Sequence, residues 1–315
     1  MRPVRAILIY FIAIFAGSAV IAPAVYFVVD SFAGSSQFCN YLISKGFHRF
    51  LTRSMMLIAL IGLYPLYRAL GIKTLAEAGL EPLRFNWRRL GYGFLFGFVT
   101  LSIPVFVSLA SGGVWLNANK TVAEILRHLF NAGFSAVVVS LIEEIVFRGG
   151  ILGSTQRIYG WRFGVIFSSA VYSIVHFFAK IDRLTEIHWY SGFAGILMML
   201  RGFTDLKAVV PGFLNLFLAG VILGLFFKRT GNLYFSIGVH AGWIFWLKTY
   251  GFFSVFGENH NVWFFGSSKL IDGWITFIVL LPVTAAMLFL YRSPKEGISG
   301  KSGLHHIDNQ KDMNQ

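Results

Sequence analysis

Apolar runs long enough to cross a lipid bilayer recur along the whole length of the chain. A helix needs roughly 20 apolar residues to span about 30 Å of hydrocarbon. The sequence is 56% hydrophobic and only 13% charged, and its mean hydropathy of +0.66 excludes an ordinary soluble domain. These features predict an all-α fold, a polytopic membrane helix bundle.

Charges, glycines and prolines at the ends of the apolar runs delimit eight candidate transmembrane helices. They cover about residues 5–29, 53–71, 91–110, 126–150, 161–179, 211–228, 232–253 and 272–291. The chain is thus predicted to form one membrane domain, residues 1–291, followed by a polar, disordered cytoplasmic tail, residues 292–315. A shorter apolar stretch within residues 180–210 is predicted to lie at the membrane surface or to re-enter the membrane.

The basic residues predict orientation rather than a nucleic-acid partner. The formal net charge is +13, but the basic side chains lie mostly in short connections between the apolar runs. They are more numerous on the side of the N-terminus, which predicts cytoplasmic termini and, in a bacterium, insertion in the inner membrane. The single cysteine, Cys39, excludes an intrachain disulfide.

A few ionisable side chains lie inside the predicted spans. Glu143, Glu144 and Arg148 occur together in "SLIEEIVFRGG", and His176 and His240 lie in later spans. A charge at the centre of a bilayer costs at least about 2.5 to 3.5 kcal/mol, so these residues are functional candidates. Glu144 and Arg148 stand one helical turn apart and are expected to pair, whereas Glu143 points about 100° away and remains available.

The spacing of these residues predicts that Glu143 and His176 face each other. Both lie equally far from the turn near Tyr159 and Gly160, roughly 25 Å along the helix axis. A carboxylate beside an imidazole can deprotonate a water, and a second histidine can stabilise the resulting oxyanion. Such a site would hydrolyse a bond at or within the membrane. In the alternative interpretation, the same side chains make only structural hydrogen bonds.

Three motifs resemble those of the CPBP family, the CAAX-protease and bacteriocin-processing membrane proteins also called the ABI family. "EEIVFRG" is similar to the family's EExxxR signature, and "YSIVH" is similar to FxxxH, with Tyr172 in place of Phe and His176 at the histidine. "AGVILGLFFKRTGNLYFSIGVHAGWI" resembles the third block, a Gly-rich span, a turn and HAxxN, but Ile244 stands where the family commonly has Asn. The resemblance covers about residues 120–250.

The resemblance implies an intramembrane endopeptidase with an active site buried in the helix bundle. The best-understood family members remove the last three residues of prenylated CAAX proteins, so the expected substrate is a membrane-associated protein or peptide. By position, Glu143 and His176 would activate the water, Glu144 and Arg148 would support the site, and His240 would help to stabilise the oxyanion. In an alternative interpretation the chain is a non-proteolytic transporter, immunity factor or scaffold that retains the polar cluster.

Two features of the expected site stay open. Ile244 removes one expected hydrogen-bond donor, and Asn215, the amide in "PGFLNLFLAG", is a candidate replacement that could instead bond to a neighbouring helix. No metal cofactor is expected, because the family resemblance favours a metal-free Glu/His pair and the H-E-x-x-H pattern is absent. Zinc held by two histidines and a glutamate is the alternative.

Overall fold

The computed structural model describes residues 3–117, 119–178, 184 and 186–290, and the predicted tail lies outside the described residues. This part of the chain is helical apart from one antiparallel pair of short strands. The elements are α1 Pro3–Ser31, α2 Gln37–Ser44, α3 Phe47–Ala69, η1 Leu83–Phe85, α4 Trp87–Ala110, β1 Val114–Leu116, α5 Val122–Glu144, η2 Ile145–Leu152, α6 Gly153–Tyr159, α7 Trp161–Val175, α8 Ser191–Met199, η3 Leu200–Phe203, α9 Leu206–Thr230, α10 Tyr234–Phe253, β2 Ser254–Phe256, α11 Val262–Phe265 and α12 Trp274–Leu290.

The all-α, polytopic fold class is confirmed. Five helical segments of the described chain are long and apolar enough to cross a membrane, namely α1, α3, α4, the continuous segment Val122–Tyr159 and α9. Each of the eight predicted spans coincides with a helix, but α7 has only 15 residues and α12 only 17. The chain is therefore an integral, multi-pass membrane protein, and the number of eight crossings stays a prediction.

Two span ends next to the candidate residues differ from the prediction. The span expected to end at Gly150 continues to Tyr159, because Ile145–Leu152 form a π-helix that joins α5 to α6. The two glycines in this turn do not terminate the helix, since neighbouring segments pack closely against them. The next span was expected to reach residue 179, but α7 ends at Val175, and His176 occupies its C-cap position.

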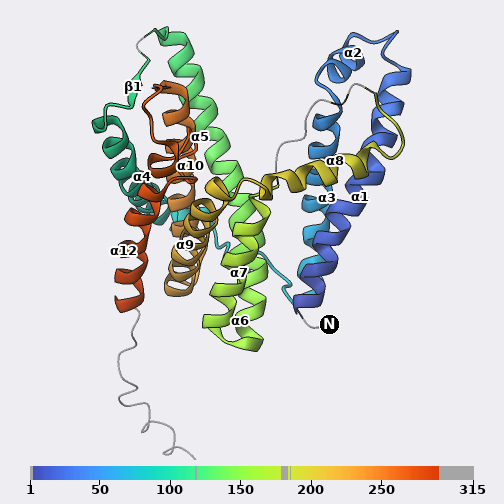
Figure 1. Ribbon diagram of the computed structural model, residues 1–315. Coiled ribbons are helices and arrows are strands. Elements are labelled where there is room, and N and C mark those ends of the chain that lie inside the picture. Colours follow the sequence, from blue (N-terminus) through green and yellow to red (C-terminus); the bar gives the residue numbers. More distant parts are fainter. Residues whose placement is uncertain (1–2, 118, 179–183, 185, 291–315) are drawn as a thin grey trace, which may run out of the picture.

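The long helices run alternately up and down, and α1 begins at the same end of the molecule at which α12 stops (Figure 1). This arrangement agrees with termini on one side of the membrane, and the cytoplasmic assignment stays a prediction. Helix α8 runs across the direction of the other helices, from the start of α9 to α1 (Figure 1). Gly192 of α8 packs directly on the backbone of Ala19, where a side chain would collide with the carbonyl oxygen.

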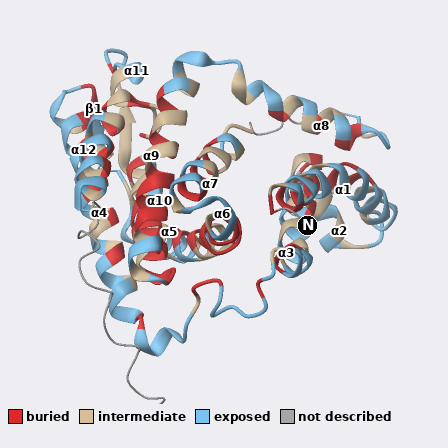
Figure 2. Cartoon of the chain, turned by 90° about the horizontal axis from the view of Figure 1, so that it is seen from below, coloured by how far each residue is buried: buried red, intermediate tan, exposed pale blue. Residues whose placement is uncertain are grey.

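Helices α1 to α3 form a group that stands apart from α4, α9, α10 and α12, with α6 and α7 between them (Figure 2). A hydrogen bond from the Tyr67 hydroxyl to the carbonyl of Ile145, 2.7 Å long, joins α3 to the π-helical turn. A Cβ atom at Gly149 would lie 2.9 Å from both the Tyr67 hydroxyl and the Ala78 carbonyl oxygen. The glycine therefore permits the close approach that holds this turn in place.

Helices α4 and α10 pack through glycines on both sides of the contact. Gly93 and Gly97 of α4 lie against the carbonyls of Phe235 and Val239, and a Cβ atom at either glycine would collide with the backbone. Gly238 and Gly242 of α10 lie in the same way against α4. Small residues four positions apart permit such close packing of helices in membranes.

This glycine contact determines the rotation of α10 about its own axis. His240 lies two residues from Gly238 and two from Gly242, which is about 200° around the helix from each of them. The imidazole therefore points away from α4. On that side of α10 lies α5, whose Glu144 contacts the imidazole.

Candidate active site

Three helices and the π-helical turn bring the candidate side chains together. Glu143 and Glu144 are the last two residues of α5, and Arg148 follows in the π-helical turn. His176 caps the C-terminus of α7, and His240 lies in the first half of α10. The structure thus brings all five together, although His176 and His240 come from two other helices.

Glu144 and Arg148 form the ion pair expected from their spacing. Arg148 Nη1 donates to Glu144 Oε1 at 2.9 Å, and both residues are completely buried. The guanidinium also donates through Nη2 to the carbonyl of Gly220 at 3.3 Å, and it lies over the ring of Tyr172 at 4.6 Å. A buried charge pair requires such additional partners, because desolvation of the ions is costly. The pair therefore anchors α5 to α7 and α9.

Glu144 has a second partner, which the sequence did not predict. Its Oε1 atom lies 3.0 Å from Nδ1 of His240. Because Oε1 also accepts a hydrogen bond from Arg148, Nδ1 of His240 carries the hydrogen of this bond. Glu144 therefore determines both the orientation and the tautomer of His240.

Glu143 lies between the two histidines. Its Oε2 atom is 3.6 Å from Nε2 of His176 and 3.7 Å from Nε2 of His240. The Glu143 and His176 side chains are 25% and 27% exposed, whereas the His240 side chain is 5% exposed. Oε2 itself is shielded and makes no hydrogen bond among the described residues. Glu143 and His176, which the spacing predicted to meet, are therefore adjacent. They are also more accessible than His240.

His176 is oriented by the helix that carries it. Its Nδ1 atom donates to the main-chain carbonyl of Tyr172, one turn earlier, at 2.7 Å. In the neutral ring this bond leaves Nε2 without a hydrogen and directed towards Glu143. Nε2 can therefore accept a hydrogen bond from a water or a substrate.

Tyr172 belongs to the same cluster, although the sequence predicted no role for it. Its hydroxyl lies 3.2 Å from Nε2 of His240, and the residue is 3% exposed. Its ring packs edge-on against Phe147 and beneath the guanidinium of Arg148. One sequence feature could have indicated a role for Tyr172, namely its departure from the FxxxH signature. A tyrosine places a hydroxyl where the phenylalanine of that signature has only a ring.

Asn215 makes structural hydrogen bonds instead of joining the cluster. Its Nδ2 atom donates to the carbonyl of Ile271 at 2.8 Å and to that of Gly273 at 2.9 Å. Both amide hydrogens are thus used to hold the chain before α12, which leaves none for an oxyanion. The suggested replacement of the missing amide is therefore wrong for Asn215, and the packing alternative describes its contacts.

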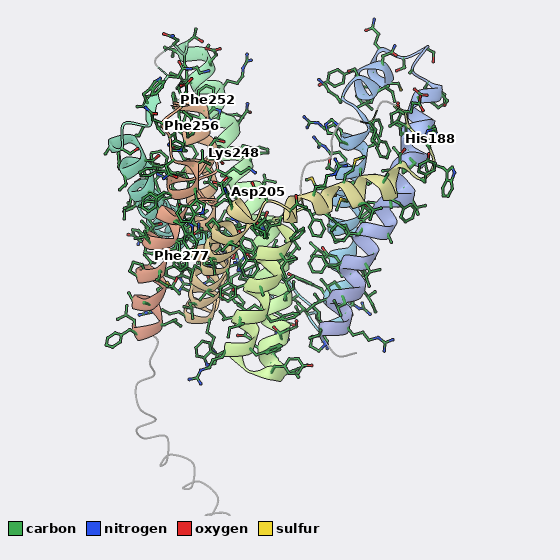
Figure 3. The ribbon with its side chains drawn as sticks, viewed as in Figure 1. His188, Asp205, Lys248, Phe252, Phe256 and Phe277 are labelled. Atoms are coloured by element: carbon green, nitrogen blue, oxygen red, sulfur yellow. The ribbon has the colours of Figure 1, made fainter. Side chains whose placement is uncertain are left out.

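The described part of the chain shows no arrangement of metal ligands. No group of three or more His, Cys, Asp and Glu in the described ranges is arranged to hold a metal ion. Nε2 of His240 bonds to Tyr172 instead of standing free as a ligand. His188 lies beside α1, far from the part of α10 that carries Lys248, and its contact with Glu186 is exposed (Figure 3). The expectation of metal-free chemistry stays a prediction.

Comparison with known proteins supports the resemblance seen in the motifs. Residues 125–246 match the model of a family described as type II CAAX prenyl endopeptidase Rce1-like. Searches of curated proteins and of solved structures find no match. The matched region contains all three motifs and every charged residue of the cluster. Residues 125–246 are thus similar to the Rce1-like type II CAAX prenyl endopeptidases.

Proposed function

We propose that this protein is an intramembrane, CAAX-protease-like endopeptidase that hydrolyses a peptide bond of a membrane-associated protein or peptide. The observation that carries the proposal is the position of Glu143 Oε2, 3.6 Å from Nε2 of His176 and 3.7 Å from Nε2 of His240. A carboxylate and two imidazoles converge there in a membrane protein whose residues 125–246 match a family model of such peptidases.

Glu143 and His176 would activate the attacking water. A separation of 3.6 Å exceeds that of a good direct hydrogen bond, so each atom keeps a lone pair for a water beside it. This water would donate its two hydrogens to Oε2 of Glu143 and to Nε2 of His176, which orients an oxygen lone pair towards the substrate carbonyl. As the C–O bond forms, Glu143 accepts the proton. Glu143 then returns that proton to the departing amine nitrogen when the C–N bond breaks.

His240 would stand beside the oxyanion that forms during this attack. Its Nε2 atom lies 3.7 Å from Glu143 Oε2, and Glu144 holds the ring through Nδ1. Glu144 and Arg148 are completely buried, so their role in the proposal is to position His240 and the end of α5. Rigidly held hydrogen-bond donors stabilise developing charge strongly, and the tautomer of His240 decides which group beside it donates.

The proposal is tested by cleavage of a defined reporter with purified protein in lipid nanodiscs. The probes are a farnesylated peptide that ends in a CAAX sequence and the same peptide without the farnesyl group. Product that appears with the wild type and is lost in Glu143→Gln supports the proposal, and the two probes reveal whether prenylation is required.

A comparison of membrane-fraction peptides from cells with wild-type protein or with Glu143→Gln extends the search to unknown substrates. If neither the reporters nor the cellular peptides show cleavage that depends on Glu143, the protein is not a peptidase of this kind. The cluster would then serve a non-proteolytic membrane protein.

A further inference from the structure

We propose that Tyr172 is a catalytic residue whose hydroxyl donates the hydrogen bond to the oxyanion. The inference rests on the proposed peptidase function and names a donor that neither the charged cluster nor the family match assigns. It follows from the hydrogen bonds around His240. They determine which of its nitrogens carries a hydrogen.

In its neutral form, the ring of His240 lacks a hydrogen on Nε2, the atom that lies near Glu143 and Tyr172. Nδ1 donates to Oε1 of Glu144 at 3.0 Å, and that carboxylate is already bound to Arg148, so it can only accept. A neutral imidazole has one ring hydrogen, which this bond places on Nδ1. Nε2 is then an acceptor, and by itself it offers no hydrogen to an oxyanion.

The hydroxyl of Tyr172 supplies the hydrogen that His240 lacks. It lies 3.2 Å from Nε2 of His240, and no other hydrogen bond of this hydroxyl is found in the described chain. Its hydrogen points to Nε2 in the resting site and turns about the Cζ–O bond towards an oxyanion that forms beside it. No bond is broken in this step. The phenol keeps its proton and only exchanges one acceptor for another.

The packing of the ring holds the hydroxyl in position for this task. Tyr172 is 3% exposed, with Phe147 edge-on to its ring and the Arg148 guanidinium over its face. The Tyr172 carbonyl also accepts from Nδ1 of His176, so one residue contacts both histidines on either side of Glu143.

The test compares Tyr172→Phe with Tyr250→Phe in the reporter assay. Both substitutions remove a buried hydroxyl, and the Tyr250 hydroxyl, at the far end of α10, bonds to Ser108 of α4. Removal of one oxyanion donor typically lowers kcat by about 10² to 10³. We expect a decrease of this size in Tyr172→Phe with little change in KM, and no such decrease in Tyr250→Phe.

Substrate affinity separates a catalytic role from a structural one. In the Glu143→Gln background, which does not turn over, addition of Tyr172→Phe should leave the dissociation constant of the reporter unchanged. The amide introduced by Ile244→Asn, one turn after His240, should restore part of kcat to Tyr172→Phe. If Tyr172→Phe alone accumulates poorly, the double variant with Ile244→Asn is assayed in its place.

Three results would overturn the inference. The first is an unchanged kcat in Tyr172→Phe while Glu143→Gln is inactive, which leaves the peptidase function intact. The second is an equal decrease in kcat for Tyr172→Phe and Tyr250→Phe, which reports general destabilisation. The third is a wild type without cleavage that depends on Glu143, which removes the proposed function and this inference together.

Discussion

Oε1 of Glu144 accepts hydrogen bonds from two side chains, Nη1 of Arg148 at 2.9 Å and Nδ1 of His240 at 3.0 Å. This relationship between Glu144 and His240 links the buried ion pair of the π-helical turn to the imidazole of α10. The two adjacent glutamates therefore have different partners. Glu144 is completely buried and holds other side chains, whereas Glu143 is partly exposed and lies between the two histidines.

Glu143→Gln should abolish most turnover without loss of the fold. The amide keeps the shape of the side chain but cannot accept a proton from water, so kcat should fall by at least about 10² to 10⁴. Reporter cleavage and the elution profile of the purified protein measure the two quantities. Glu124→Gln is the matched control, because Glu124 caps the exposed start of the same helix through Thr121. Full turnover in Glu143→Gln would contradict its role as base.

Arg148→Ala should reduce the amount of folded protein more than it changes the chemistry of what remains. The substitution leaves Glu144 as a buried charge without its cation, and breaking such a pair costs about 3 to 5 kcal/mol. Expression level and thermal melting in detergent report the effect. Arg88→Ala, at the exposed start of α4, should change neither measurement. Equal stability of the two variants would argue against an anchoring role for the pair.

Removal of metal should leave the purified protein active. The proposed mechanism uses only Glu143 and His176 to activate water, so incubation with a strong chelator should not change kcat. Metal analysis of the purified protein should find no stoichiometric zinc. If one equivalent is found, and its removal and return switch cleavage off and on, the metal-free mechanism is wrong.

Gly97→Leu should disrupt the packing of α4 on α10 and thereby move His240. A side chain at this position would collide with the carbonyl of Val239, the residue directly before His240. We expect a lower melting temperature and a lower kcat, because helix separation shifts the imidazole away from Glu144. Gly91→Leu on the same helix is the control, since nothing lies within 4 Å of a Cβ atom there. Similar behaviour of both variants would show that the glycine contact is not needed.

The sequence by itself determined those features that depend on spacing along one helix or one hairpin. Long apolar runs predicted the membrane helices, the four-residue interval predicted the pair of Glu144 and Arg148, and equal distances from the turn predicted that Glu143 meets His176. These inferences need only the rise and the angular period of an α-helix. They failed where the local geometry changes, as in the π-helical turn that continues the span beyond Gly150.

Only the tertiary structure decided which side chains of different helices share hydrogen bonds. His240 reaches Glu144 because the glycines of α4 and α10 fix the rotation of α10, and no pattern within α10 alone specifies that angle. The same applies to the Tyr172 hydroxyl, which meets His240 across the contact between α7 and α10. Asn215 bonds to Ile271, which lies 56 residues later in the sequence, in the segment before α12. A polar side chain in a dry interior bonds to the partner that packing brings within about 3 Å, and sequence spacing does not encode that neighbour.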